Sequence, residues 1–79
     1  MSKRVFIKVL AEYNEYNQIT PIRIIWPDGR EYEVDRLLSV KPGVAKSGGS
    51  GECYMCRIQD KVIPIYQDWV SGAFWADGK

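Results

Sequence analysis

The sequence has no histidine and only two cysteines, and these absences remove several kinds of site at the outset. Histidine is the usual general base and the commonest metal ligand, so the ordinary partner of a catalytic nucleophile is missing. A structural zinc ion needs four ligands, which two cysteines cannot supply. Two cysteines are also too few for a disulfide scaffold, which favours a reducing compartment such as the cytoplasm. We therefore expect no metal, no cofactor and no catalytic residue.

The sequence also lacks an excess of charge and any long hydrophobic run. Eleven Lys+Arg against ten Asp+Glu leave a net charge of +1, so no overall field attracts polyanions and nucleic-acid binding would need a local patch. The longest apolar runs, such as Ile24-Ile25-Trp26, are far shorter than the roughly 18 residues of a membrane helix. We recognise no targeting segment and expect no contact with membranes.

What the chain does contain is a high share of apolar and aromatic residues. Hydrophobic residues make up 46% of the 79, with three Trp and five Tyr, which is typical of a globular chain. They recur with a period of two, as in Val5, Ile7 and Val9, which indicates half-buried strands. We predict an all-β, single domain over residues 1–79, built as a small antiparallel barrel or strongly curved sheet of five to six strands, SH3-like or similar.

Two breaks in this pattern are informative. Leu37 and Leu38 interrupt the alternation of the strand that follows Glu31, which predicts a bulge or bend there. Residues 41–52 are rich in glycine and serine, and we predict that they form a mobile loop. No window has the spacing of an amphipathic helix.

The stretch Trp26-Pro27-Asp28-Gly29-Arg30 predicts the first hairpin in detail. Pro27 suits the second position of a type I turn and Gly29 the left-handed position after it, which gives a three-residue loop. This loop sets Trp26 opposite Arg30. A two-residue loop would instead place apolar residues against glutamates, so the three-residue loop is preferred.

A second hairpin joins residues 53–58 to residues 62–66, with Asp60-Lys61 as its predicted loop. In this register Cys56 faces Ile65. Residues three apart on a strand point to opposite faces, so Cys53 and Cys56 cannot grip one ion together or form an unstrained disulfide. We interpret the Cys-x-x-Cys spacing as a coincidence, with Cys56 in the core.

The outer face of this second hairpin is less polar than a face exposed to water should be. Methionine, tyrosine and arginine are enriched at protein interfaces, and an exposed apolar patch commonly marks a contact surface. The C-terminal segment around Trp69 and Trp75 could instead fold over this face. The candidate interaction face consists of Met55, Arg57, Pro64 and Tyr66, next to Cys53.

Four cations interleaved with aromatic residues form the candidate nucleic-acid surface: Arg23, Arg36, Arg57 and Lys61. Small β-barrels bind single strands by stacking bases on such faces. Three carboxylates, Glu31, Glu33 and Asp35, lie among these positions and weaken the positive field. Alternating acids on one strand face are more typical of a solvated surface than of an acid–base pair.

Two motifs, W-P-D-G-R-E-Y-E-V-D-R at residues 26–36 and G-G-S-G-E-C-Y-M-C-R-I at residues 48–58, resemble those of a family of short uncharacterised proteins from Firmicute bacteria. The resemblance runs from Val5 to about Tyr66, and the ending DWVSGAFWADGK departs from the family pattern. Its members look like stand-alone domains without an assigned activity, so the resemblance supports the fold more than a function. Most of the shared residues have structural duties that compete with a role in a site: Asp28 and Gly29 build the turn, and we expect Arg30 to stack on Trp26 as a cation–π pair. The candidate site that the resemblance implies consists of Trp26, Asp28, Gly29, Arg30, Tyr32, Asp35 and Arg36.

The sequence thus leaves three functional hypotheses. The leading one is a non-catalytic binding module with an unknown protein partner, or with a second copy of itself as a homodimer. The alternative is a small β-barrel that binds single-stranded nucleic acid. The third is an enzyme that uses carboxylates near the Asp28 hairpin.

Overall fold

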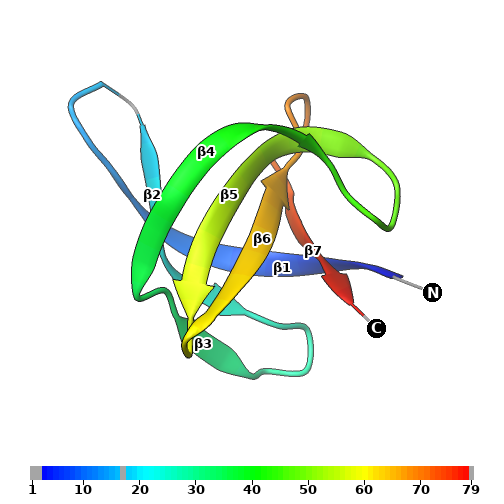
Figure 1. Ribbon diagram of the computed structural model, residues 1–79, viewed down its shortest axis with the longest axis horizontal. Helices are drawn as coiled ribbons and strands as arrows, with labels where there is room; N and C mark the ends of the chain where they lie inside the picture. Colours follow the sequence, from blue (N-terminus) through cyan, green and yellow to red (C-terminus); the bar gives the residue numbers. More distant parts are fainter. Residues whose placement is uncertain (1–2, 17, 79) are drawn as a thin grey trace.

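The computed structural model describes residues 3–16 and 18–78, and these residues form one antiparallel sheet of seven strands without a helix (Figure 1). The predictions of an all-β single domain and of a strongly curved sheet are confirmed. The strands are β1 (Lys3–Tyr13), β2 (Ile19–Ile25), β3 (Glu31–Glu33), β4 (Arg36–Val44), β5 (Ser50–Ile58), β6 (Lys61–Gln67) and β7 (Phe74–Gly78). Since the described residues include no helix, they include none that could cross a membrane.

The sheet order is β3-β2-β1-β7-β6-β5-β4, so the two outermost strands are consecutive in the chain. Only Val34 and Asp35 connect them. The Val34 amide donates to the Ile22 carbonyl oxygen at 2.7 Å, and the Asp35 amide donates to that of Arg57 at 2.8 Å. This short connection curls the sheet into a half-barrel, in which β4, β5 and β6 arch over β1 (Figure 1).

The described residues form more strands than the five to six predicted. A single strand was expected from Glu31 onward, but the chain leaves β3 after Glu33 and begins β4 at Arg36. Strands β3 and β4 lie at opposite edges of the sheet. The predicted single strand is therefore interrupted where the sheet curls. The bulge predicted at Leu37-Leu38 is confirmed, because the β4–β5 register shifts between Leu37 and Ser39.

The concave side of the half-barrel holds the main core. Ile65 and Cys56 are fully buried, and Ile24 and Ile58 are 1% and 2% exposed. These side chains come from β2, β5 and β6, and Ile7 and Ala76 extend the same cluster onto β1 and β7. Burying an aliphatic side chain of this size stabilises a fold by about 1.5–3 kcal/mol, so this cluster fixes the curl of the sheet.

The first hairpin is confirmed in its predicted register. The Gly29 amide donates to the Trp26 carbonyl oxygen at 2.9 Å and the Trp26 amide donates to that of Arg30 at 2.8 Å. Ile24 pairs with Tyr32, and Gly29 has a φ of +93°. The positive φ is the left-handed position for which glycine is suited.

The register predicted for the second hairpin is wrong by two residues. Cys56 pairs with Ile63 rather than with Ile65, and the loop consists of Gln59 and Asp60, whose φ angles are +51° and +61°. Two-residue turns of this kind usually carry Asn-Gly or Asp-Gly, and the sequence has neither here. A shift of two residues keeps every side chain on its face, so the predicted inner and outer faces are correct.

The segment 41–52, predicted as a mobile loop, is largely strand. β4 continues to Val44 and β5 begins at Ser50, with Lys41 paired to Cys53 and Val44 to Ser50. The turn between them is short: the Gly48 amide donates to the Ala45 carbonyl oxygen at 3.0 Å. The glycine and serine residues of this segment predicted a loop. Glycine also occurs in strands where another backbone approaches closely, so the prediction was wrong.

Asp77 on β7 holds this turn from outside it. Its two carboxylate oxygens accept the amides of Lys46 and Ser47, each at 3.0 Å. Burial by itself would raise the pKa of Asp77, but these hydrogen bonds outweigh it and the pKa is lowered from its ordinary 3.8. The turn and the last strand are therefore joined by a charged contact.

Replacing Asp77 with asparagine is expected to lower the free energy of unfolding by about 1.5–2 kcal/mol at pH 7, in the lower part of the range for hydrogen bonds to charged groups. Because the folded-state pKa is lowered, the wild type holds this stability above the ordinary pKa and loses it as pH falls through the folded value. Urea unfolding of both proteins from pH 7 to pH 2 should show the difference shrinking below about pH 4. A difference that stays constant would contradict it, and Asp60→Asn, at a 94% exposed carboxylate, is the control.

Candidate functional site

An apolar concavity with polar groups on its rim lies where the half-barrel stays open. We call the opening between the beginning of β2 and the outer edge of β4 the seam. The concavity there, the seam groove, has a volume of about 450 Å³. Its lining residues are Gln18, Ile19, Thr20, Leu37, Val40, Glu52, Tyr54, Gln67 and Trp69.

Trp69 stands on the rim because of a tight turn between β6 and β7. The Asp68 carboxylate accepts the Val70 amide at 2.7 Å and the Ser71 amide at 2.9 Å. Gly72 closes this turn with a φ of +76°. The Trp69 side chain remains 59% exposed, and its indole Nε1 donates to Glu52 Oε2 at 3.1 Å. An exposed tryptophan is thus held in one orientation beside a carboxylate.

The floor of the groove is aromatic with a polar end. The Tyr54 hydroxyl donates to Gln67 Oε1 at 3.0 Å, and Gln67 Nε2 donates to the Gly72 carbonyl oxygen at 3.2 Å. Burial raises the pKa of Tyr54, and the Glu52 carboxylate raises it further. The phenol therefore stays neutral at physiological pH and acts as a hydrogen-bonding group.

Both sides of the seam have unpaired strand edges. In the part of the chain that the structure describes, β4 pairs only with β5, and β3 pairs with β2 only over Arg23 to Ile25. An edge strand directs alternate N–H and C=O groups away from its neighbour. Pro42, which has no N–H, sits in β4 as proline does in edge strands. The edge able to accept another strand is therefore 36–41, beside the groove.

The C-terminal strand β7 covers part of the predicted interaction face. Tyr66 is only 6% exposed because Trp75 of β7 stacks on it, with ring centroids 5.5 Å apart. Cys53 is buried in the same small cluster, and Met55 packs against it. Arg57 remains exposed and Pro64 is partly buried. The cover by Trp75 was predicted as one alternative, whereas Trp69 lies at the seam groove.

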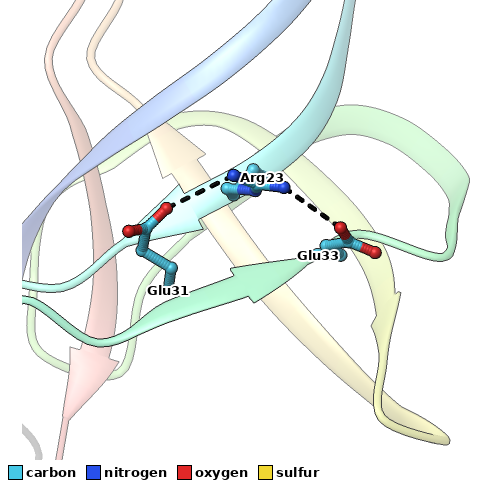
Figure 2. Close-up of polar contacts among 3 residues, drawn as sticks. All are labelled: Arg23, Glu31 and Glu33. Atoms are coloured by element: carbon cyan, nitrogen blue, oxygen red, sulfur yellow. Dashed lines mark hydrogen bonds and ion pairs between the residues drawn. The ribbon is translucent and has the colours of Figure 1, made fainter.

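The four candidate nucleic-acid residues do not form one surface. Arg23 is held between Glu31 at 3.4 Å and Glu33 at 3.0 Å, as Figure 2 shows. Arg36 and Arg57 are cross-strand neighbours on β4 and β5, and both are exposed. Lys61 begins β6 opposite Ile58. Two of the four cations are therefore adjacent, and a third is neutralised by carboxylates.

The hairpin motif forms a turn built on its own contacts. The Asp28 carboxylate accepts the Arg30 amide at 3.0 Å and Arg30 Nε at 2.6 Å, and these bonds lower the pKa of Asp28. The Arg30 guanidinium lies 5.9 Å from the centroid of the Trp26 ring, as predicted for a cation–π pair. Trp26 and Tyr32 pack against the core cluster. Trp26, Asp28, Gly29, Arg30 and Tyr32 line three open clefts, but Asp28 and Arg30 are already paired with each other.

The two cysteines lie on opposite faces of β5, as predicted from their spacing. Both are free thiols, Cys53 in the cluster under Trp75 and Cys56 in the main core. Burial raises the pKa of Cys53, and it raises that of Cys56 to about 11. Thiols with raised pKa values are poor nucleophiles at neutral pH. Among the described residues there is no cluster of three or more His, Cys, Asp or Glu that could hold a metal ion.

The seam groove was missed from the sequence, although two signals pointed to it. Pro42 indicates an edge strand. Trp69 lies in the turn after β6, where a large apolar side chain is left exposed. Neither signal indicates which other edge lies opposite. That β2 and β4 face each other depends on the curl of the sheet.

The chain matches no family model, no curated protein and no solved structure. The resemblance to the Firmicute family stays a prediction. What the seam groove binds has to be inferred from its geometry and its charges.

Proposed function

We propose that the protein is a non-catalytic interaction module that binds an extended polypeptide segment of a partner protein in the seam groove. The observation that carries this proposal is the coincidence of an apolar groove with an unpaired strand edge, residues 36–41 of β4. In this mode of recognition the peptide adds a strand to the sheet. Its backbone bonds to the edge, and alternate side chains enter the groove.

A short peptide suits this edge better than a second copy of the chain does. Two copies of β4 paired antiparallel over their full length would bring Pro42 from each into the new ladder, and proline cannot donate a hydrogen bond to it. The face around Tyr66, first considered for self-association, is covered by Trp75. The test below must therefore distinguish peptide binding from the formation of a homodimer.

The test is selection of phage-displayed ten-residue peptides on the immobilised protein, followed by NMR titration of the labelled protein with an enriched synthetic peptide. We expect shifts at the groove residues, and loss of binding when alternate peptide nitrogens are methylated. Val40→Asn, at a 44% exposed groove position, should weaken binding about tenfold, which equals about 1.4 kcal/mol. Isothermal titration calorimetry measures this change.

Val44→Asn is the matched control, since Val44 lies on the same strand beyond Pro42 and is 74% exposed. It should change the affinity less than twofold. No enriched peptide, or shifts confined to another face, would overturn the proposal. Sedimentation velocity of the free protein tests whether a second copy of the chain occupies the groove instead. A concentration-dependent dimer that Val40→Asn abolishes would replace the peptide with a second copy.

Single-stranded nucleic acid is the second candidate, and the adjacent exposed pair Arg36 and Arg57 favours it. Titrating the same labelled protein with a mixed oligonucleotide pool tests this candidate. Shifts around these two residues that fade steeply with salt, as counterion release requires, would support it.

Catalysis by the Asp28 region is the least supported of the three hypotheses. Asp28 and Asp77 border one cleft with Lys3 and Trp26. A general acid needs a pKa near the working pH. Both carboxylates are engaged in hydrogen bonds that lower their pKa values.

A further inference from the structure

We infer that the seam groove selects a basic residue, so that the bound segment places a lysine or arginine side chain against Glu52 and Trp69. This inference rests on the proposed function and adds the chemistry of the ligand to it. It derives from the charge of the groove, from the free carboxylate oxygen in it, and from the exposed aromatic ring beside that oxygen.

The charge of the groove has one sign. Among the described residues that line it, Glu52 is the only one with an ionisable acid or base charged at neutral pH; the others are apolar or neutral polar residues and aromatics. A cation in the groove is attracted by Glu52, and the exposed cations of the adjoining edge, Arg36 and Lys41, do not line the groove. An anionic side chain would lie beside Glu52 and be repelled, so the groove discriminates by charge.

Glu52 has an oxygen available for the ligand. Its Oε2 accepts the Trp69 indole N–H at 3.1 Å. Within residues 3–16 and 18–78, no hydrogen bond or ion pair engages Oε1. The indole bond fixes the carboxylate without neutralising it, since indole carries no charge. A guanidinium or ammonium can therefore form a charge-assisted hydrogen bond there.

Trp69 supplies the second half of the recognition. The residue is 59% exposed and its ring is held in place through Nε1, so little side-chain freedom is lost on binding. The aliphatic stem of a lysine or arginine packs on such a ring while its charged end reaches a nearby carboxylate. Tryptophan is also the strongest cation–π partner among the aromatic side chains.

The experiment extends the peptide selection to Glu52→Gln. Glutamine keeps an acceptor for the Trp69 indole but removes the charge, so the rim geometry is preserved. We expect peptides selected on the wild type to share one lysine or arginine position. Replacing that residue by norleucine should weaken binding to the wild type about tenfold and to Glu52→Gln less than twofold. Asp60→Asn, which changes the net charge equally but lies in the β5–β6 turn, should behave as the wild type.

The outcomes separate the two proposals. If no peptide is enriched on the wild type, the proposed function fails and the inference fails with it. If peptides bind in the seam groove without a shared basic residue, only the inference is overturned. Equal losses on the wild type and Glu52→Gln when norleucine replaces the cation would also overturn it, because the cation would then act elsewhere.

Discussion

Replacing Trp75 with alanine is expected to lower the free energy of unfolding by about 3–5 kcal/mol, the range for a large aromatic residue in a packed site. Trp75 is 1% exposed, it stacks on Tyr66, and the Arg4 guanidinium lies 4.9 Å from the centroid of its ring. A domain of this size rarely has more than about 3–5 kcal/mol in reserve. We therefore expect the variant to be largely unfolded at 25 °C, as seen by far-UV circular dichroism and amide NMR.

Trp69→Ala is the matched control, because it makes the same substitution at a tryptophan that is 59% exposed. It should leave the fold intact and shift the urea midpoint only slightly. A milder variant, Trp75→Phe, keeps an aromatic ring over Tyr66 and should remain folded. Equal stability of Trp75→Ala and Trp69→Ala would show that the cover over the outer face of β6 is dispensable.

The Trp75 result also bears on function. Trp75 covers Tyr66 and Cys53, the part of the outer face that the sequence marked as an interaction surface. Suppose that Trp75→Phe is folded but associates with itself, while the wild type does not. The apolar residues of that face would then be covered by Trp75 in the wild type, where they serve as internal packing. The seam groove then remains as the surface available to a partner.

Gly51→Ala is expected to destabilise the fold by about 3 kcal/mol, at the upper end of the range for overpacking. A Cβ at this buried position would overlap the carbonyl oxygen of Gln67 and come within 3.2 Å of the Trp75 ring. The clash is with backbone of β6, so a change of rotamer cannot relieve it. The strands would have to separate where Glu52 pairs with Gln67.

Ser50→Ala is the control for this substitution, since Ser50 precedes Gly51 on β5 and is exposed. Its urea midpoint should match that of the wild type. Because the Gly51 clash lies beside Glu52 and Gln67, any folded fraction of Gly51→Ala should also bind a groove peptide more weakly. A fully stable Gly51→Ala would contradict the close approach of β5 and β6.

The hairpin around Asp28 could be predicted to the residue because its information is local. Proline, aspartate and glycine each impose one backbone preference there, and the pattern of apolar partners rejects the other register. The second hairpin could be predicted only to its faces. Gln59 and Asp60 form a turn with two positive φ angles without the usual Asn-Gly or Asp-Gly signal, so the register was misjudged by two.

The candidate site could not be predicted in the same way, because its residues come from distant parts of the chain. Ile19, Val40 and Trp69 are brought together only when the sheet curls. Arg23 is a second example. The sequence predicted it as a contact for nucleic acid, with Glu31 and Glu33 only as nearby charges that weaken the positive field. In the structure both glutamates form ion pairs with Arg23.

By itself, the sequence determined the all-β class, the inner and outer faces of the strands, the first turn and the bulge after Leu37. Each of these follows from preferences that act within a few residues, namely period-two burial and the φ angles of glycine and proline. Only the tertiary structure decided that Trp75 covers Tyr66, that β4 is left as an edge, and that a groove opens opposite β2. These depend on how the sheet curls to bury one continuous core, and the free energy of that burial belongs to contacts between strands far apart in the chain.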